Sequence, residues 1–245
     1  MLFFSKRANK TAPLLSFMQT DIHSHLLPGV DDGSQDLQTS LFFIEKLQEL
    51  GISRIITTPH IMMDRYPNSV NTLQSPFESV YQSLKDANNN ISFKYAAEYY
   101  LDEQFVPLLQ QPLLTITGNK VLVEISFVSA PPQLHQWLFD IQAAGYQPIL
   151  AHPERYGYYH NEFNQYHLLK ELGCQLQVNL LSLTGYYGKG VQKAATLLLE
   201  QQLADFIGTD LHHEKHLHAI IQISNNNKLR KTLDEYPFKN NTLTE

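Results

Sequence analysis

Asp21-Ile22-His23-Ser24-His25 closes an apolar run that begins near residue 18, and this stretch indicates the fold of the chain. A His-x-His pair by itself is a weak signal of a metal site. Further candidate ligands, most of them at the ends of later apolar runs, are Asp32, His60, Glu98, Glu124, His152, Asp210 and His212. Residues i and i+2 of a strand point to the same side, so His23 and His25 can approach one cation together, as can Asp210 and His212. The sequence therefore predicts a sheet whose strand ends converge on bound metal.

Short strand-like runs alternate with helical patterns along the chain. Strands are expected near 18–23, 53–58, 92–98, 120–125, 147–151, 175–179 and 205–209. Helices are expected from Ser34 to Gly51, from a capping box with proline at Ser75-Pro76-Phe77-Glu78, and over 132–144, 163–172, 189–202 and 213–224. This order predicts an α/β fold with a mostly parallel sheet that closes into a barrel. Active sites of such barrels lie at the C-terminal strand ends, where we expect His23, His60, Glu98, Glu124, His152 and Asp210.

Length and composition fit one folded unit. The chain has 245 residues, of which 43% are hydrophobic and 17% are charged, as is usual for a globular protein. A single α/β barrel domain commonly has about 250 residues. We expect residues 1–18 to form a flexible N-terminal extension and residues 19–245 to form that one domain.

Charge and hydropathy argue against several classes of partner. Lys and Arg number 18 and Asp and Glu number 24, which gives a net charge of −6, and no basic run suggests a nucleic-acid surface. No apolar stretch approaches the roughly 18 residues of a membrane span, and Met1-Leu2-Phe3-Phe4 is too short for a signal peptide. We therefore expect a cytoplasmic protein without a nucleic-acid partner and without membrane insertion. The oligomeric state is left open.

The candidate ligands are imidazoles and carboxylates without thiolate, because the chain has a single cysteine, Cys174. This ligand set suits Mn, Fe or Zn, and it is too large for one ion, so two or three cations are expected. Adjacent divalent cations activate water near neutral pH and stabilise an in-line displacement, which is chemistry for phosphoester hydrolysis. Glu98 and Glu124 can bridge two cations. Asp31 is expected to cap a turn beside the ligand Asp32.

Arg155 follows His152 closely, and we expect its guanidinium to bind phosphate rather than to pair with Glu154. Arg65 and Lys189 are weaker candidates for phosphate binding. Cys174 is not followed by an arginine at the spacing of a cysteine-phosphatase loop, which excludes a cysteinyl-phosphate route.

Aromatic residues and further histidines accompany the candidate ligands. The tyrosine pairs at 99–100, 158–159 and 186–187 either form an aromatic rim or pack within loops. The remaining histidines fit surface or core positions, and they are His135, His160, His167, His213, His216 and His218. A solvated helix face is expected for the last three.

The chain resembles the polymerase and histidinol phosphatase (PHP) superfamily in the order of its motifs. These motifs are Asp21-Ile22-His23-Ser24-His25, Val30-Asp31-Asp32-Gly33, Thr58-Pro59-His60, Ala97-Glu98, Glu124, His152-Pro153-Glu154-Arg155-Tyr156 and Thr209-Asp210-Leu211-His212. The second and the sixth are typical of its bacterial tyrosine-phosphatase branch, the CpsB/CapC type found with capsule and exopolysaccharide export genes. The resemblance extends from about residue 19 to about residue 225.

This resemblance implies a distorted (β/α)7 TIM-like barrel, the PHP fold, with two or three metal ions, usually manganese. It also implies hydrolysis of phosphotyrosine on the tail of a bacterial tyrosine kinase in the control of capsule synthesis. The implied metal ligands are His23, His25, Asp32, His60, Glu98, Glu124, His152, Asp210 and His212. Arg155 would bind the phosphoryl oxygens, and Asp210 and His212 would lie with it at the reacting group.

Three alternatives remain beside the tyrosine phosphatase. The same metal site could act on a small phosphomonoester such as histidinol phosphate, or on a nucleotide or nucleic-acid end, although the acidic charge disfavours nucleic acid. An amidohydrolase also uses His-x-His, but typically with a carbamylated lysine where this chain has Glu98 and Glu124. A non-catalytic partner of a kinase or export complex is disfavoured because every ligand position is filled.

Overall fold

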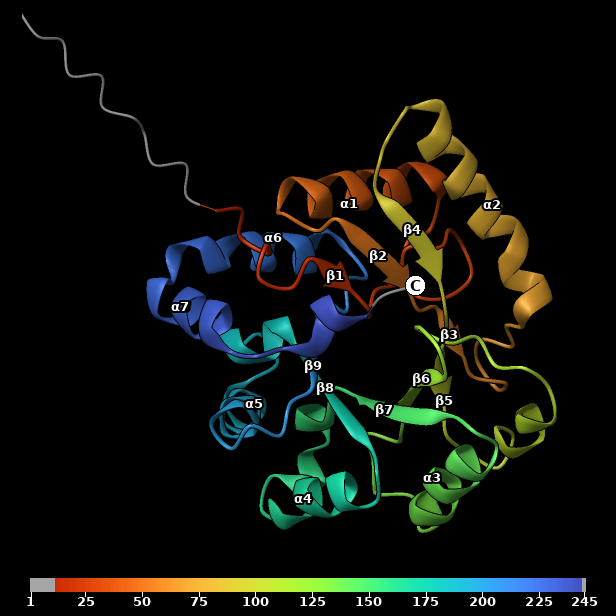
Figure 1. The fold of residues 1–245 in the computed structure, drawn as a ribbon, viewed down its shortest axis with the longest axis vertical. Helices are drawn as coiled ribbons and strands as arrows, with labels where there is room; N and C mark the ends of the chain where they lie inside the picture. Colours follow the sequence, from red (N-terminus) through yellow and green to blue (C-terminus); the bar gives the residue numbers. More distant parts are fainter. Residues whose placement is uncertain (1–11, 244–245) are drawn as a thin grey trace, which may run out of the picture.

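Parallel strands form the centre of the molecule, and helices surround them (Figure 1). The structure, a computed structural model, describes residues 12–243. The strands are β1 (Thr20–Asp21), β2 (Arg54–Thr57), β3 (His60–Ile61), β4 (Ser92–Tyr95), β5 (Glu98–Tyr100), β6 (Lys120–Glu124), β7 (Gln147–Ala151), β8 (Gln175–Asn179) and β9 (Phe206–Gly208). They pair in parallel in two sheets, with the orders β1-β2-β4 and β3-β5-β6-β7-β8-β9. The predicted α/β class with parallel strands is confirmed.

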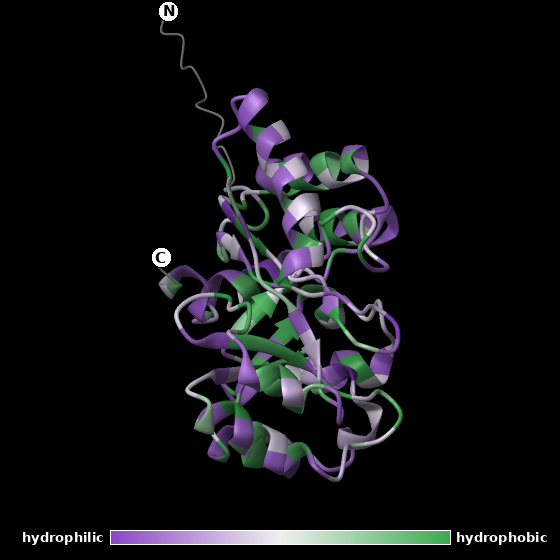
Figure 2. Cartoon of the chain, turned by 90° about the vertical axis from the view of Figure 1, so that its right-hand side faces the viewer, coloured by the Kyte–Doolittle hydropathy of each residue, from purple (hydrophilic) through white to green (hydrophobic). Residues whose placement is uncertain are grey.

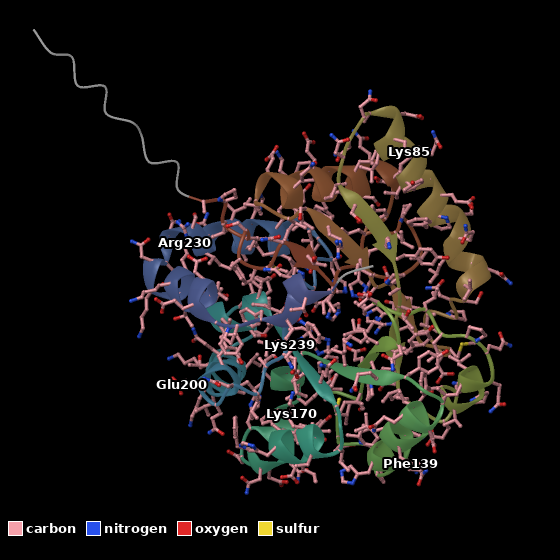
Figure 3. The ribbon with its side chains drawn as sticks, in the orientation of Figure 1. Lys85, Phe139, Lys170, Glu200, Arg230 and Lys239 are labelled. Carbon is pink, nitrogen blue, oxygen red and sulfur yellow. The ribbon has the colours of Figure 1, made fainter. Side chains whose placement is uncertain are left out.

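Helices cover the outside of these sheets. They are α1 (Leu37–Glu49), α2 (Val70–Asp86), α3 (Leu134–Ala143), α4 (Asn164–Glu171), α5 (Lys189–Glu200), α6 (Glu214–Gln222) and α7 (Asn227–Glu235). Figure 2 shows the strands as hydrophobic segments in the interior and the helices as mixed in hydropathy. Figure 3 shows polar side chains such as Lys85, Glu200 and Arg230 at the periphery. Within residues 12–243, no helix combines the length and hydropathy that a membrane span requires.

Two strands of the first sheet continue, after a short interruption, into strands of the second sheet. β2 is interrupted at Thr58-Pro59 and resumes as β3, and β4 is interrupted at Ala96-Ala97 and resumes as β5. Hydrogen bonds continue across the interruption, since Ala96 N donates to Thr57 O at 2.8 Å and Glu98 N donates to Pro59 O at 3.1 Å. The predicted strand 92–98 is therefore two strands, and β3 was not predicted. Pro59 explains the break, because proline has no N–H to donate within the ladder.

Contacts also join the edge strands β1 and β9. Asp210 N donates to His23 O at 2.7 Å, and Ser24 forms a parallel bridge with Leu211. At the other end of these strands, the buried Asn240 side chain donates to Thr20 O and Ile207 O at 2.8 Å each and accepts from Ile207 N at 3.0 Å. The amide of Asn240 thus bonds to both edge strands.

The strands have two apolar faces. One face contacts the helices through a large core that extends from Leu15 to Phe238. The opposite face carries a smaller buried cluster of Ile22, Ile56, Ala96, Ile116, Leu122, Ile149, Ala151, Phe206 and Leu243. Side chains alternate along a strand, so Glu124 lies on the same face as Leu122, and Glu98 on the same face as Ala96. These carboxylates therefore stand at the C-terminal end of the smaller cluster.

Helix α2 corrects one prediction. It begins at Val70 instead of at Ser75, and its capping box is formed by Ser69 and Thr72. Pro76 lies inside the helix, where it removes one backbone hydrogen bond. Leu73, Val80 and Leu84 are buried on one face of α2, and this packing offsets the loss at the proline.

The other predicted helices agree with the structure to within about two or three residues at each end, a difference typical of helix boundaries. Asp36 caps α1, since its carboxylate accepts from Thr39 N at 2.7 Å. Helix α7 was not predicted. Its apolar residues are Leu229 and Leu233, one turn apart, and two such residues are too few to predict a helix from the sequence.

The predicted N-terminal extension requires a second correction. Residues 1–11 lie outside the described residues, but Leu15 and Met18 are fully buried. Leu15 N also donates to Leu50 O at 2.7 Å, next to the C-terminal end of α1. Residues 13–18 therefore pack against the domain, because two apolar side chains there contribute to its core.

Candidate metal centre

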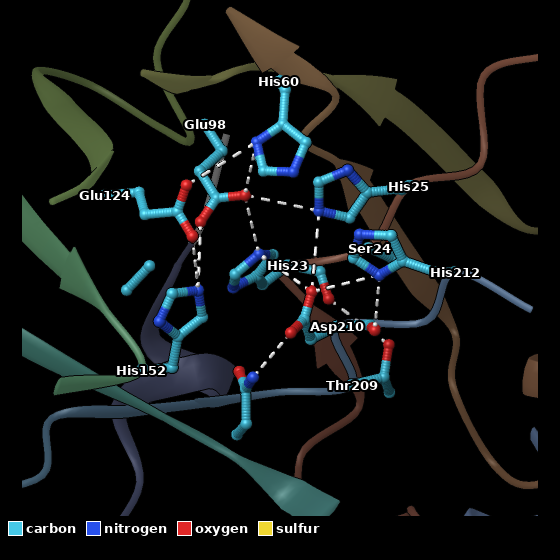
Figure 4. A network of polar contacts seen from close by, with 12 residues as sticks. His23, Ser24, His25, His60, Glu98, Glu124, His152, Thr209, Asp210 and His212 are labelled. Carbon is cyan, nitrogen blue, oxygen red and sulfur yellow. Dashed lines mark hydrogen bonds and ion pairs between the residues drawn. The ribbon is translucent and has the colours of Figure 1, made fainter. Parts of the chain in front are cut away.

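All nine predicted ligands lie together on the side of the C-terminal strand ends. Figure 4 labels eight of them, all except Asp32. His23 and His25 follow β1, His60 begins β3, Glu98 begins β5, and Glu124 ends β6. His152 follows β7, and Asp210 and His212 follow β9. Asp32 comes from the loop between β1 and α1. Seven segments of the chain thus place imidazoles and carboxylates at one position.

The ligand atoms form four overlapping groups, each small enough to surround one cation. The groups are His25, Asp32, His60 and His212; His23, His25 and Asp210; His23, Glu98 and His152; and His60, Glu98 and Glu124. Within each group the atoms lie within 4.8 Å of one another. Because His23, His25, His60 and Glu98 each belong to two groups or more, the arrangement suits several cations that share ligands.

Glu98 lies at the centre of the cluster. Its Oε2 is 3.2 Å from His23 Nε2, 3.3 Å from His25 Nε2 and 3.2 Å from His60 Nδ1. Its Oε1 is 3.2 Å from His152 Nε2. A buried carboxylate in contact with several imidazole nitrogens is expected of a residue that bridges cations.

Several polar atoms of the cluster are buried without a hydrogen-bond partner. They are Nε2 of His23, Nε2 of His25, Nδ1 of His60 and both carboxylate oxygens of Glu98. Such atoms are unfavourable unless something satisfies them. These same atoms face each other in the cluster, so divalent cations fit the donor set.

The opposite ring nitrogens of the ligand histidines have oxygen partners. His23 Nδ1 lies 2.7 Å from Gln177 Oε1, and His25 Nδ1 lies 2.8 Å from Asp31 Oδ2. His212 Nδ1 lies 2.9 Å from the carbonyl oxygen of Asp210. Since an oxygen acceptor selects the tautomer with hydrogen on Nδ1, the lone pair of Nε2 is left for a cation.

Asp31 supports the ligands beside it. Besides His25, its carboxylate accepts from Gly33 N at 2.9 Å and from His60 N at 3.0 Å. Asp31 therefore caps the turn, as predicted, and also orients two ligands, which was not predicted. Asp32 is the more exposed of the two carboxylates, and its Oδ1 lies 3.6 Å from Nε2 of both His60 and His212.

The sequence analysis missed two buried amides on β8. Gln177 Nε2 donates to Asn179 Oδ1 at 3.0 Å, and Asn179 Nδ2 donates to Asp210 Oδ2 at 2.6 Å. Because Gln177 also contacts His23, the amides connect two ligands across the sheet. The sequence did contain a signal for them, because these two polar residues lie two positions apart on a strand whose end carries no predicted ligand.

Burial and neighbouring charges shift the pKa values of the cluster. Burial lowers the pKa of His152, but the carboxylates of Glu124 and Glu98, which lie 3.4 Å and 3.2 Å from its Nε2, outweigh this effect and raise the pKa to about 9. Burial raises the pKa of Glu98, while the charge on His23 and neighbouring imidazoles holds it well below its ordinary value. Burial lowers the pKa of His212 to about 4. Without cations, the cluster therefore retains protons among its imidazoles.

Two ligands have a strained backbone. His152 has φ of 35° and Asp210 has φ of 49°, both in the left-handed region. Residues other than glycine rarely adopt this conformation, and it is found at functional sites where packing enforces it. Thr209, just before Asp210, is held by Asp21, whose carboxylate accepts from Thr209 Oγ1 at 2.6 Å and from Thr209 N at 3.0 Å.

Arg155 lies beside the ligands. Its Nη1 donates to Asp210 Oδ2 at 3.0 Å, and its guanidinium carbon lies 4.9 Å from the ring centre of Phe127 and 4.5 Å from that of Tyr187. Glu154 is instead fully buried and accepts from Asn179 N at 2.9 Å. The charged partner of Arg155 is therefore Asp210 rather than Glu154, and the expected contact of its guanidinium with phosphate stays a prediction.

A cavity of about 570 Å³ opens over the cluster. Its walls include Arg155 and Arg65, but Lys189 lies on α5 outside it. Tyr100 and Tyr187 line the cavity. One tyrosine from each of two predicted pairs therefore forms part of an aromatic rim around the cavity. Tyr99 and Tyr159 are instead buried in the core, and Tyr158 is half-buried against it.

His216 was predicted on a solvated helix face, and this prediction is wrong. It is buried, lines the cavity, and its Nδ1 lies 3.1 Å from Asp210 O. His213 also lines the cavity and caps α6, whereas His218 is exposed as predicted. Cys174 is buried far from solvent, and burial raises the pKa of its thiol to about 12, which agrees with the exclusion of a thiolate nucleophile.

Comparisons with known proteins agree with this geometry. Residues 19–240 match the model of a family described as capsular polysaccharide synthesis, CpsB/CapC. The tyrosine-protein phosphatase YwqE of Bacillus subtilis is 30% identical over 202 residues, which cover 80% of this chain and 78% of YwqE. The tyrosine-protein phosphatase CpsB of Streptococcus agalactiae serotype V is 27% identical over 200 residues, which cover 79% of this chain and 82% of CpsB.

A solved structure is also similar. It belongs to a study of YwqE from Bacillus subtilis and CpsB from Streptococcus pneumoniae, described as unique metal-dependent tyrosine phosphatases. The TM-score is 0.77 at 26% sequence identity, and the match covers 91% of this chain and 93% of the other.

Proposed function

Since the chain belongs to the CpsB/CapC family, we propose that it is a metal-dependent protein-tyrosine phosphatase with a role in capsule or exopolysaccharide synthesis. The observation that carries this proposal is the placement of Arg155 in one cavity with the four overlapping ligand groups. Cations and a guanidinium that face the same space suit a substrate with a dianionic phosphoryl group.

We assign the metal ligands to His23, His25, Asp32, His60, Glu98, Glu124, His152, Asp210 and His212. Two or three Mn²⁺ ions are the proposed occupants, because imidazole and carboxylate ligands without thiolate suit manganese, with Fe or Zn as alternatives. When bound, such cations supply Lewis-acid polarisation of phosphoryl oxygens and lower the pKa of water. The buried atoms without partners support this assignment.

The protein residues have separate roles in the proposed reaction. Arg155 binds a phosphoryl oxygen through a guanidinium N–H that does not contact Asp210, and Asp210 holds Arg155 in position. Asp210 and His212 complete the group of residues around the reacting phosphorus. The leaving tyrosinate has a pKa of about 10, so it needs less help from an acid than an alkyl alkoxide would.

We propose that the two sheets together form one distorted (β/α)7 barrel, in a single domain against which residues 13–18 also pack. Supporting this, β2 and β4 continue into β3 and β5, and the contacts between β1 and β9 join the two edges. We further propose that the protein is cytoplasmic, since kinases use cytoplasmic ATP. Its proposed substrate is the phosphotyrosine tail of a bacterial tyrosine kinase.

The test compares phosphotyrosine peptides with histidinol phosphate, with and without a chelator, in the presence of added Mn²⁺. We expect rapid turnover of the peptides, slow turnover of histidinol phosphate, and loss of both with the chelator. Faster turnover of histidinol phosphate would favour a phosphatase for small phosphomonoesters. Peptide turnover that is insensitive to the chelator would contradict the metal assignment.

A further inference from the structure

The guanidinium of Arg155 lies beside two aromatic rings that line the same cavity, those of Phe127 and Tyr187. Resting on the proposed function, we propose that Phe127, with Val128 and Tyr187, forms a subsite for the aromatic ring of the substrate. This subsite would set the preference of the enzyme for aryl over alkyl phosphates.

Exposure distinguishes the two apolar residues of this subsite from core residues. Phe127 is 44% exposed and Val128 is 90% exposed, and both line the cavity over the ligand cluster. Apolar area that remains exposed beside a polar cavity is available for a ligand. Exposed aromatic residues elsewhere, such as Phe139 on α3 in Figure 3, do not line this cavity.

The loop that carries Phe127 is held in place by neighbouring tyrosines. Tyr158 Oη donates to Ser126 O at 2.7 Å, and Ile125 N donates to Tyr156 Oη at 3.1 Å. The ring of Phe127 lies 5.4 Å from that of Tyr156. Phe127 is therefore positioned before a substrate arrives, which reduces the entropy lost on binding.

The position of the phosphoryl group determines where the rest of the substrate lies. Arg155 and the ligand cluster would hold the phosphoryl oxygens at the base of the cavity. The phenyl ring is attached to phosphorus through one oxygen, so it must extend along the wall toward the mouth. Phe127 and Tyr187 flank Arg155 on that wall, where they can contact a ring face or edge.

Phe127 could instead act only by holding Arg155 and His152, whose ring centre is 5.6 Å from that of Phe127. These two roles predict different results. A residue that only holds Arg155 affects every phosphate or phosphonate equally. A residue that contacts the aryl ring affects aromatic ligands and leaves small alkyl ligands nearly unchanged.

The experiment measures direct binding of phenylphosphonate and methylphosphonate to the Mn²⁺-loaded protein by calorimetry. The variants are Phe127→Leu, which keeps an apolar side chain against Arg155, and Phe127→Tyr, which keeps the ring. We expect Phe127→Leu to weaken phenylphosphonate binding by about fivefold to tenfold and methylphosphonate binding by less than about twofold. Phe127→Tyr should bind both ligands as the unmodified protein does.

Val128→Ser provides a second variant, because this exposed side chain contributes nothing to the core. It should weaken phenylphosphonate binding by about twofold to threefold and leave methylphosphonate binding unchanged. Phe139→Leu is the control on a remote helix and should change neither affinity.

An equal loss for both phosphonates in Phe127→Leu would overturn the subsite and leave a positioning role for Phe127. Unchanged binding of both ligands in Phe127→Leu and in Val128→Ser would overturn it as well. Failure of the proposed function is distinguishable, because it would show as absent turnover of phosphotyrosine peptides by the unmodified protein.

Discussion

Each of three ligand histidines has one ring nitrogen bonded to an oxygen of the protein and the other directed at the cluster. For His23 the partner is Gln177, and for His25 it is Asp31. The partner determines both the tautomer and the orientation of the ring. We therefore expect the affinity of the proposed centre for cations to depend also on residues that do not coordinate a cation.

Gln177→Ala should lower the affinity for Mn²⁺ by about 10- to 100-fold, because His23 loses the acceptor that orients it. Gln177→Glu retains an acceptor and should recover most of the affinity. The measurement is metal titration by calorimetry, with circular dichroism to confirm the fold. Gln175→Ala, at the beginning of the same strand, is the matched control. Equal affinities for Gln177→Ala and the control would contradict this role.

Arg155→Ala should reduce kcat/KM for phosphotyrosine peptides by about 100-fold or more, because a preorganised donor to the phosphoryl group is lost. Bound Mn²⁺ should remain at the unmodified level, which elemental analysis can check. Arg155→Lys should recover little activity, since an ammonium does not reproduce the planar fork that reaches Asp210 and phosphate together. Unchanged turnover in Arg155→Ala would exclude the assigned role.

The candidate ligands could be predicted from the sequence because His and Glu are unusual at the ends of apolar runs. Glu98 and Glu124 each come at the end of an apolar run, where an unpaired buried carboxylate would be unfavourable. Gln177 and Asn179 could not be assigned in the same way, since amides in a strand have many other uses. His216 looked like part of a polar helix, and only the packing of α6 against Asp210 shows that it is buried.

At the scale of elements, the contacts between β1 and β9 depend on a residue from the C-terminal part of the chain. Asn240 is not part of a strand, yet its side-chain amide forms three hydrogen bonds with backbone groups of Thr20 and Ile207. A side-chain amide has the same donor and acceptor groups as a peptide bond, so it can continue a backbone ladder.

Asn240→Ala should lower the free energy of unfolding by about 2 kcal/mol, since backbone groups of Thr20 and Ile207 lose buried partners. Urea denaturation measures this change. Asn241→Ala is the neighbouring control: Asn241 is exposed and donates one bond, to Phe17 O at 2.9 Å. The control should change stability by less than about 0.5 kcal/mol. A similar loss in the two variants would show that Asn240 does not hold the edges together.

Strands β6 and β7 were predictable because each contains consecutive apolar residues between turn residues, and β8 because its polar and apolar residues alternate. β3 has two residues, His60 and Ile61, and such a length carries no periodicity. The start of α2 was mislocated because Ser75-Pro76 matches the pattern of a helix start. The true cap, Ser69, carries an equally good signal, and only the burial of Leu73 shows which one is used.

At the scale of the whole molecule, the pKa values of the candidate ligands predict that the centre releases protons when it binds cations. Burial lowers the pKa of His25, but Asp31 outweighs it and raises the pKa well above its ordinary value, and the pKa of His152 is about 9. Without metal, both imidazoles are therefore protonated near neutral pH. A cation needs their neutral form, so binding releases protons.

The affinity for Mn²⁺ should consequently rise with pH between about 6.5 and 8.5, by about tenfold per pH unit for each proton released. The sign follows from the raised pKa values: lowering the pH favours the protonated imidazoles and opposes the cation. Calorimetry in buffers of different ionisation enthalpy measures both the affinity and the number of protons. An affinity that is independent of pH would contradict the protonation of these histidines.

The overall class was predictable because strands alternate with helices, and the order of ligand residues placed them on one edge. The packing of Leu15 and Met18 was not predictable, since two apolar residues in a short segment do not reveal what they cover. The interruptions at Thr58-Pro59 and Ala96-Ala97 also depend on how neighbouring strands meet rather than on local preference.

The small apolar cluster around Leu122 and Ile149 bears on how substrate enters the cavity and how products leave it. These side chains occupy the interior directly behind Glu98 and Glu124, so the ligand cluster opens toward the mouth beside Phe127. A phosphotyrosine that enters with its phosphate foremost leaves its aromatic part nearest to the exit. On the proposed binding mode, we expect the dephosphorylated peptide to depart first and inorganic phosphate to follow it through the same opening.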